Sequence, residues 1–301
     1  MFPVVKKLQD KSNIFVGNFL NARTLFMKKI ITFVFGLLLF SFVHGQEAIH
    51  FTMGLLPGNS YDQSVSQKIK IELNLDSSST EMLAKMEAGG MKNPTTQEQE
   101  TNMETLIKSG AMDKQTGKMP VVMSIIKADE KLSKILNPDT KFIGSARMNE
   151  LPVYDSISGI TLDDNQKQIM LKTMSSLSQI NLPNKSLKPG QSDTIHTPIN
   201  IPVAGVTMKM DYVTVYLLKS IVGKTAFFDV SANFVLNMEV KDLPVGGNGS
   251  GNGSMEYDLD KHYPSLYKLK YQIFMRIAKE GLIMHMNMIS DLTSISKIQP
   301  S

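Results

Sequence analysis

Residues 69–75 read IKIELNL, and this stretch decides the fold class. Its four apolar residues alternate with Lys70, Glu72 and Asn74, as in a strand with one face buried and the other in water. The same period of two recurs in the second half of the chain. It predicts further strands at residues 206–217, 227–238, 267–277 and 282–288. The sequence therefore predicts a protein dominated by strands.

Short turns separate the later predicted strands. Val222-Gly223-Lys224 precedes the strand that begins at Phe227, and Lys279-Glu280-Gly281 separates the last two strands. Turns of this length join antiparallel neighbours, so the C-terminal half is expected to form a meander. Capping signatures and apolar residues at helical spacing predict helices at 78–88, 96–108 and 163–178. The expected fold class is α+β, mainly β: a large curved antiparallel meander sheet with a few packed helices.

The N-terminal region contains the parts of a secretory signal peptide. Lys28 and Lys29 follow Met27, an apolar run of 14 residues follows them, and Gly45 stands before a polar residue. The apolar run is shorter than the roughly 20 residues that cross a bilayer as a helix. We therefore expect cleavage after Gly45 and export of the product to the periplasm or the medium.

This leader defines the expected organisation of the chain. Residues 1–26 are interpreted as a misassigned start, and residues 27–45 as the signal peptide. The remainder divides into a mixed helix and strand part at 46–181, a proline-rich extended connection at 182–202, and the antiparallel meander at 203–301. The region from 46 to 301 has the length of one large or two small domains.

Removal of the leader changes the charge of the protein. Six of the 32 Lys and Arg residues and one of the 28 Asp and Glu residues lie in residues 1–45, which leaves 26 basic and 27 acidic residues and a net charge of −1. Nucleic-acid binding needs a basic surface, so nucleic acid is not an expected partner. The chain has no cysteine, which excludes disulfides, thiolate metal sites and cysteine nucleophiles.

Several segments resemble known sequences. They are Lys188-Pro189-Gly190, residues 212–220, residues 223–228 and residues 253–258. Together they resemble secreted β-meander proteins of Bacteroidota that carry no assigned activity. The resemblance implies a β-rich fold and export, and it implies no chemistry.

Two polar segments follow the middle of the meander. Residues 246–254 alternate Gly with Asn and Ser, a composition typical of a flexible tether, so a mobile loop between two strands is expected there. Glu256, Asp258, Asp260 and His262 follow as the densest group of ionisable residues. They could hold a hard cation or perform acid–base chemistry, but the spacing also fits a solvated strand entrance, which we favour.

Methionine is abundant, with 21 residues, and tryptophan is absent. The alternation places Met208 and Met210 on one side of a predicted strand, and Met284, Met286 and Met288 on one side of another. Three interpretations are open: ordinary core packing, an adaptable cavity wall for an apolar ligand, or a Cu(I) site built from thioethers.

These observations lead to a functional hypothesis. A curved sheet covered by helices would enclose an apolar interior, so we expect an exported, non-catalytic envelope protein that binds or carries an apolar small molecule or lipid. The five methionines would line its cavity, and no cofactor is expected. The alternatives are a structural or partner-binding envelope protein, a Cu(I)-binding protein, and an enzyme built on Asp258, Asp260 and His262.

Overall fold

The computed structural model describes residues 48–77, 84, 88–90, 92–133, 136–160, 162–177, 183, 185–203, 206–240, 243–279 and 282–300. The expected leader lies outside this part of the chain, as does nearly all of the helix expected at 78–88. No helix in these ranges is both long enough and apolar enough to pass through a membrane.

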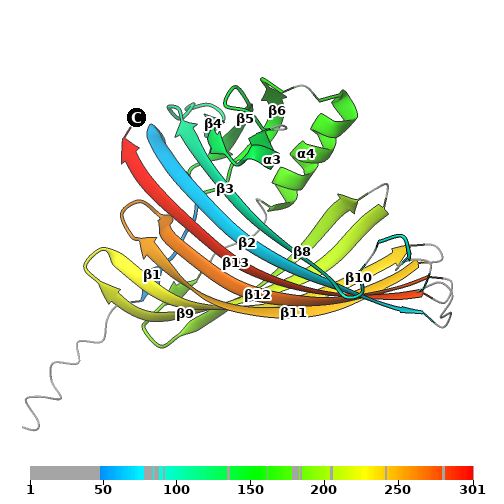
Figure 1. Cartoon of the computed structure of the whole chain (residues 1–301). Coiled ribbons are helices and arrows are strands. Elements are labelled where there is room, and N and C mark those ends of the chain that lie inside the picture. Colours follow the sequence, from blue (N-terminus) through cyan, green and yellow to red (C-terminus); the bar gives the residue numbers. More distant parts are fainter. Residues whose placement is uncertain are drawn as a thin grey trace, which may run out of the picture. The chain divides into compact units, whose positions relative to one another are not determined.

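Long strands make up most of the described chain (Figure 1). The helices are α3 (Glu130–Ser133) and α4 (Asp164–Leu177). The strands are β1 (Ile49–His50), β2 (Asn59–Ser77), β3 (Thr95–Ser109), β4 (Lys118–Ala128), β5 (Lys141–Arg147), β6 (Val153–Ser158), β7 (Ser186–Leu187), β8 (Ser192–Val203), β9 (Val206–Val222), β10 (Thr225–Val240), β11 (Leu243–Asp258), β12 (Tyr263–Lys279) and β13 (Leu282–Pro300).

All strands except β1 and β7 form one antiparallel sheet of eleven strands, in the order β6-β5-β4-β3-β2-β13-β12-β11-β10-β9-β8. It consists of two meanders, β2–β6 and β8–β13. They join where β13 pairs with β2 along its whole length, from Leu282 opposite Ser77 to Pro300 opposite Asn59. The mainly β fold and the C-terminal meander are confirmed, and both parts of the chain contribute to a single sheet.

Helix α4 belongs to the segment that runs from one edge of the sheet to the other. It follows β6, precedes β8, and contacts both of these edge strands. Its start is a capping box, because Gln166 N donates to Asp163 Oδ1 at 2.8 Å and Asp163 N donates to Gln166 Oε1 at 3.2 Å. The helix expected at 163–178 is therefore confirmed, and it spans the gap between the two sheet edges.

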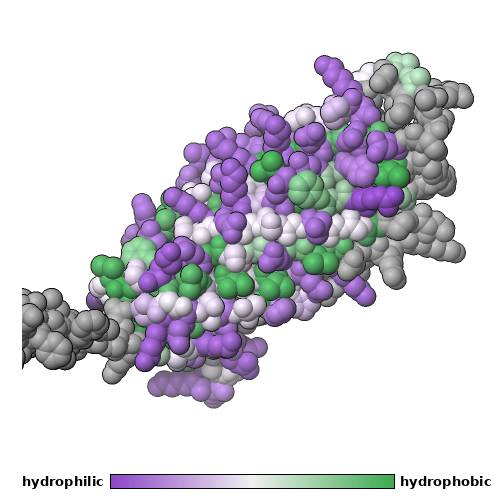
Figure 2. Space-filling view, turned by 90° about the horizontal axis from the view of Figure 1, so that it is seen from below, coloured by the Kyte–Doolittle hydropathy of each residue, from purple (hydrophilic) through white to green (hydrophobic). Residues whose placement is uncertain are grey.

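The two faces of the sheet differ in polarity. We call the face toward α4 the inner face; in β2 it carries Tyr61, Ile69 and the other odd-numbered residues. The outer face carries charged side chains, including Lys68 and Lys70, whose Nζ atoms lie 3.6 and 3.8 Å from Glu100 and Glu98 of β3. Figure 2 shows this outer face, where hydrophilic residues dominate and hydrophobic ones are scattered among them. The strand predicted at residues 69–75, with its apolar residues on one face, is therefore confirmed.

The buried side chains form three clusters on the inner face. The first, around Tyr61, Met123 and Tyr154, joins β2–β6 to Leu171 of α4. The other two lie on the second meander, one around Phe51 and Tyr216 and one around Tyr212, Phe234, Leu269 and Ile273. Three separate clusters therefore pack on one curved face of the sheet.

The helix expected at 96–108 is wrong, because these residues form β3. The capping signature from Thr95 to Glu98 is outweighed by the sheet, in which β3 pairs with β2 from Leu73 opposite Thr95 to Ser60 opposite Lys108. This register sets Glu98 and Glu100 beside lysines and turns Met103 and Ile107 toward the inner face. A helix of this length is marginal in water even with a capping signature, whereas cross-strand pairs add up along the whole of β3.

The mobile loop expected at 246–254 is also wrong, because the segment lies in the interior of β11. Glycine occupies every second position from Gly247 to Gly253 and faces β12 closely: a Cβ atom at Gly253 would lie 1.8 Å from the Lys268 carbonyl oxygen, and one at Gly249 would lie 2.3 Å from that of Gln272. Glycine is therefore needed for β12 to approach β11 on the inner face, where the sheet bends. The absence of side chains signals close packing here, not a tether.

The proline-rich region at 182–202 contains β7 and most of β8. Pro198 and Pro202 lie in β8, which is an edge of the sheet. Proline cannot donate a ladder hydrogen bond, so it is tolerated at an edge strand and discourages further pairing there.

Candidate functional site

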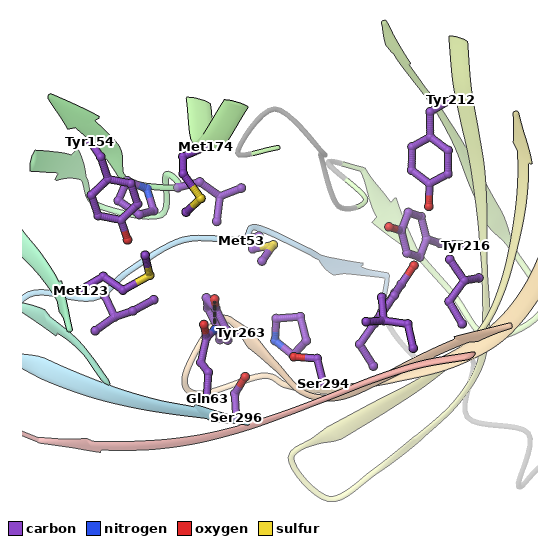
Figure 3. Close-up of a pocket in the computed structure, with 17 residues that line it drawn as sticks. Met53, Gln63, Met123, Tyr154, Met174, Tyr212, Tyr216, Tyr263, Ser294 and Ser296 are labelled. Atoms are coloured by element: carbon purple, nitrogen blue, oxygen red, sulfur yellow. Dashed lines mark hydrogen bonds between the residues drawn. The ribbon is translucent and has the colours of Figure 1, made fainter. Parts of the chain in front are cut away.

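A cavity of about 380 Å³ lies on the inner face, between the sheet, α4 and the segment that follows β1 (Figure 3). It is in the volume range of small-molecule sites. Its lining is mostly apolar and includes three methionines and five tyrosines. The lining residues are Met53, Gln63, Ile107, Met123, Leu151, Pro152, Tyr154, Met174, Tyr212, Tyr216, Tyr263, Pro264, Tyr267, Leu269, Leu292, Ser294 and Ser296.

All three buried clusters contribute to this lining. Ile107, Met123, Tyr154 and Tyr263 belong to the first cluster, and Tyr216 belongs to the second. Tyr212 and Leu269 belong to the third cluster. The cavity is therefore the space that the three clusters leave where they meet.

The segment after β1 is fixed at both ends, and this positions Met53 in the cavity wall. Phe51 packs edge-on against Phe228 and Tyr257, with ring centroids 5.0 and 5.4 Å apart. Leu55 is fully buried, and its backbone N donates to Glu150 O at 3.2 Å. The two anchors hold the residues between them across the inner face.

Tyrosine hydroxyls supply most of the polar groups of the cavity. Tyr263 Oη accepts a hydrogen bond from Gln63 Nε2 at 2.7 Å. Tyr267 is hydrogen-bonded through its side chain to both Tyr212 and Tyr216. These residues come from β2, β9 and β12, so the hydroxyl groups link strands that are distant along the chain.

Burial keeps these hydroxyls in their neutral form. It raises the pKa of Tyr263 to about 12, against the opposing effect of the hydrogen bond from Gln63. Burial also raises the pKa of Tyr154, Tyr216 and Tyr267, and neighbouring tyrosines add to each of these shifts. At neutral pH these four side chains therefore present uncharged O–H groups.

The five methionines singled out from the sequence are not among the lining residues. Met284, Met286 and Met288 are half-buried at successive inner-face positions of β13, and Met288 packs against the third cluster. Met210 packs against the same cluster, whereas the side chain of Met208 lies outside the described part of the structure. Strands β9 and β13 are separated by three others, so Met210 and Met288 pack against the same cluster from strands that are not adjacent.

The acidic segment has other local contacts. Asp258 Oδ1 accepts hydrogen bonds from the backbone N of Asp260 and Lys261 at 2.9 and 3.0 Å, and Asp260 forms an ion pair with Lys224. His262 Nδ1 lies 3.0 Å from Thr52 Oγ1. Glu256 lies in β11, opposite Leu266. Within the described ranges, no three His, Asp or Glu side chains are grouped so that they could hold a metal ion.

Sequence reasoning missed the tyrosines and the three lining methionines. The tyrosines carried a usable signal, because Tyr212 and Tyr216, and likewise Tyr263 and Tyr267, are four residues apart, and an even spacing places strand residues on one face. Met53, Met123 and Met174 carried no signal that joins them, although Met123 alternates with Met119 and Val121 in β4 and Met174 lies among the apolar residues of α4. They come from three elements of different kinds, and only the tertiary structure brings them together.

Comparisons with known proteins do not identify the chain. No protein-family model matches it, and no curated protein does. Among solved structures, it is similar to Ail, the attachment invasion locus protein of Yersinia pestis, at 7% identity over 80% of this chain and 100% of that chain, with a TM-score of 0.13. It is also similar to a mutant Rh. blastica porin at 7% identity over 78% of this chain and 100% of that one, with a TM-score of 0.21. At these TM-scores the likeness supports no conclusion about fold or activity.

Proposed function

We propose that this protein is a non-catalytic protein of the cell envelope that binds or carries an apolar small molecule or lipid in the cavity beside α4. Export is inferred from the leader at residues 27–45. The resemblance to secreted proteins of Bacteroidota supports the same location. The proposal concerns the chain after removal of this leader.

The observation that carries the proposal is the cavity itself. It holds about 380 Å³ between apolar side chains, and tyrosine and glutamine groups supply a few polar atoms within it. Binding sites for small apolar ligands combine these two features. The half-buried methionines Met284, Met286 and Met288 extend the apolar surface along the inner face, and they are a second possible contact region for a long ligand.

Native mass spectrometry of the protein purified from the envelope of its own cells tests this proposal. The sample is measured intact and again after organic extraction. We expect an extra mass in the intact protein that is lost on extraction and recovered as an apolar compound. A protein that carries no extra mass and binds no apolar dye would contradict the proposal, and a bound copper ion would support the thioether site instead.

A partner-binding role is the second candidate, and exposed apolar side chains near the β6 edge favour it. Ile143 and Val153 lie on the outer face of β5 and β6 and are 39% and 59% exposed. Apolar groups exposed together can mark a protein interface. Analytical ultracentrifugation of the purified protein and its Val153→Lys variant tests this role: a self-associated species lost in the variant would support it, and two monomers of equal mass would exclude self-association.

A further inference from the structure

The charge of the cavity wall indicates which apolar molecules it can accept. None of the 17 described lining residues is charged, and the polar groups of their side chains are hydroxyls and one amide. The charged residues of β2 that flank this region, such as Asp62 and Lys68, alternate onto the outer face. A ligand in the cavity therefore meets neutral hydrogen-bonding groups within an apolar wall.

A charged side chain in the described part of the chain lies close to this wall. Asp193 of β8 is buried and stands opposite Tyr216 in the ladder between β8 and β9. Its Oδ1 atom lies 2.5 Å from Lys185 Nζ, so its charge is already balanced within the protein. It offers no countercharge to an anion, and it would have to leave its own partner to balance a cation.

Neutral hydroxyls can satisfy a neutral oxygen but cannot compensate an ion. A ligand hydroxyl or carbonyl oxygen can exchange hydrogen bonds with Gln63, Tyr263 or Tyr267 and so keep the bonds it had in water. A carboxylate or ammonium group placed beside these hydroxyls would give up part of its hydration without gaining a partner of opposite charge. Burial of an unpaired charge is strongly unfavourable, whereas burial of a hydrogen-bonded neutral polar group costs little.

We propose that the cavity selects uncharged amphiphiles, in which a hydrocarbon chain carries a hydroxyl, ester or other neutral oxygen, over charged amphiphiles of the same chain length. Long-chain alcohols, esters and neutral lipids belong to this class, and fatty-acid anions do not. The chain lies against Met53, Met123 and Met174, and the oxygen is hydrogen-bonded by the tyrosine hydroxyls. This inference rests on the proposed function and specifies its ligand.

Competition among three ligands of equal chain length tests the selectivity. The protein is loaded with the uncharged dye N-phenyl-1-naphthylamine, and the dye is displaced by 1-dodecanol, dodecanoate or dodecylammonium at pH 8, below the solubility limit of the alcohol and the micelle concentrations of the two ions. We expect dodecanol to displace the dye at a concentration at least about tenfold lower than either ion does. Equal or better displacement by one of the ions would overturn the inference while leaving the proposed function intact.

Two tyrosine variants test where the ligand oxygen binds. Tyr267→Phe removes a hydroxyl from the cavity wall, whereas Tyr271→Phe removes one from the same strand and face outside it, where Tyr271 Oη accepts from Gln67 at 3.1 Å. We expect the first variant to lose about three- to tenfold in affinity for dodecanol, and the second to change it less than twofold. Equal effects in the two variants, or none in Tyr267→Phe, would contradict the assigned position of the ligand oxygen.

A lysine introduced into the wall should reverse the preference. Ser294→Lys places an ammonium group among the lining residues, where it can pair with a carboxylate. In a variant whose circular dichroism matches that of the parent, dodecanoate should then displace the dye better than dodecanol. An unchanged order of the ligands would contradict the inference that wall charge sets the selectivity.

Discussion

The inner face of the sheet differs between its α4 end and its opposite end. At the α4 end, side chains such as Tyr61, Met119 and Leu55 are completely buried, and the cavity lies among them. At the other end, apolar residues such as Leu73 and Met286 repeat with the same regularity but are only half-buried. The strands are continuous across both ends, so the alternation of the sequence is the same. What differs is the cover that α4 and the segment after β1 provide.

This difference shows that periodicity determines which face is apolar, whereas connections between strands determine where that face is enclosed. The enclosing elements are short and lie outside the long strands. They also supply Met53 and Met174, two of the three methionines in the cavity wall. The covered end is therefore expected to contribute most of the stability and the ligand site.

The largest expected effect is on stability, in a pair of identical substitutions at the two ends. Leu55→Ala removes a fully buried side chain that anchors the covering segment, and it should lower the free energy of unfolding by about 2–5 kcal/mol. Leu73→Ala removes a half-buried side chain at the other end and should cost about 1 kcal/mol. Urea denaturation measures both values. Equal losses would show that the two ends are equally well packed.

Alkaline pH should weaken the covered end through its buried tyrosines. Burial raises the pKa of Tyr263 to about 12 in the folded protein, from 10.0 for an exposed tyrosine. The folded state therefore resists losing this proton, so the stabilisation is complete below pH 10 and is lost between about pH 10 and 12. The contribution is on the order of 2 kcal/mol. Urea denaturation from pH 8 to 12 measures it.

The control for this titration is Tyr263→Phe, which cannot ionise at this position. Its stability should fall less steeply than that of the parent protein between pH 10 and 12. Parallel curves for the two proteins would mean that other groups account for the alkaline loss of stability.

The glycines of β11 provide a smaller pair of stability effects. A Cβ atom at Gly253 would collide with the Lys268 carbonyl oxygen, whereas one at Gly246 meets nothing within 4 Å. Gly253→Ala should therefore cost about 1–3 kcal/mol because the backbone of β12 has to move. Gly246→Ala should change stability by less than about 0.5 kcal/mol. Thermal unfolding of both variants decides whether close approach of the strands, and not flexibility, requires the glycine run.

The smallest expected effect is on ligand affinity, again in a matched pair. Met174→Trp enlarges a side chain in the cavity wall, and Met284→Trp makes the same change at the uncovered end. The first should weaken dye binding about tenfold because the new ring occupies the space, and the second should alter it less than twofold. The chain has no other tryptophan, so its fluorescence reports ligand contact directly. A weaker dye affinity in Met284→Trp alone would place the ligand at the other end.

Much of the fold could be predicted from the sequence, because strand alternation and short turns are local signals. The strands at 69–75 and 227–238 lie within β2 and β10, and the capping box at Asp163 marks the start of α4. The helix predicted at 96–108 is wrong because capping and helical spacing involve only neighbouring residues. Strand β3 is stabilised by pairing with β2, which lies in another part of the chain. Alternation alone does not show which residues of β9 face inward: Val213 and Val215 are apolar, yet Tyr212 and Tyr216 occupy the inner face.

The sequence predicts the kind of candidate site, an apolar interior, but it does not predict the position of that site. A curved apolar interior follows from alternation and chain length, whereas the position of the cavity depends on where α4 and the segment after β1 cross the sheet. The methionine alternation in β13 drew attention to residues 284–288 because it is regular within one strand. The lining methionines are single residues on separate elements, so no single periodic pattern includes all three.

Methyl NMR of the protein labelled with ¹³C at the methionine methyl groups tests the central claim most directly. The spectrum is recorded with and without 1-dodecanol, and signals are assigned by single Met→Leu substitutions. The cavity account predicts that the signals of Met53, Met123 and Met174 shift on ligand addition, while those of Met284, Met286 and Met288 stay in place. Shifts confined to the second group would contradict it and would locate the ligand at the uncovered end of the sheet.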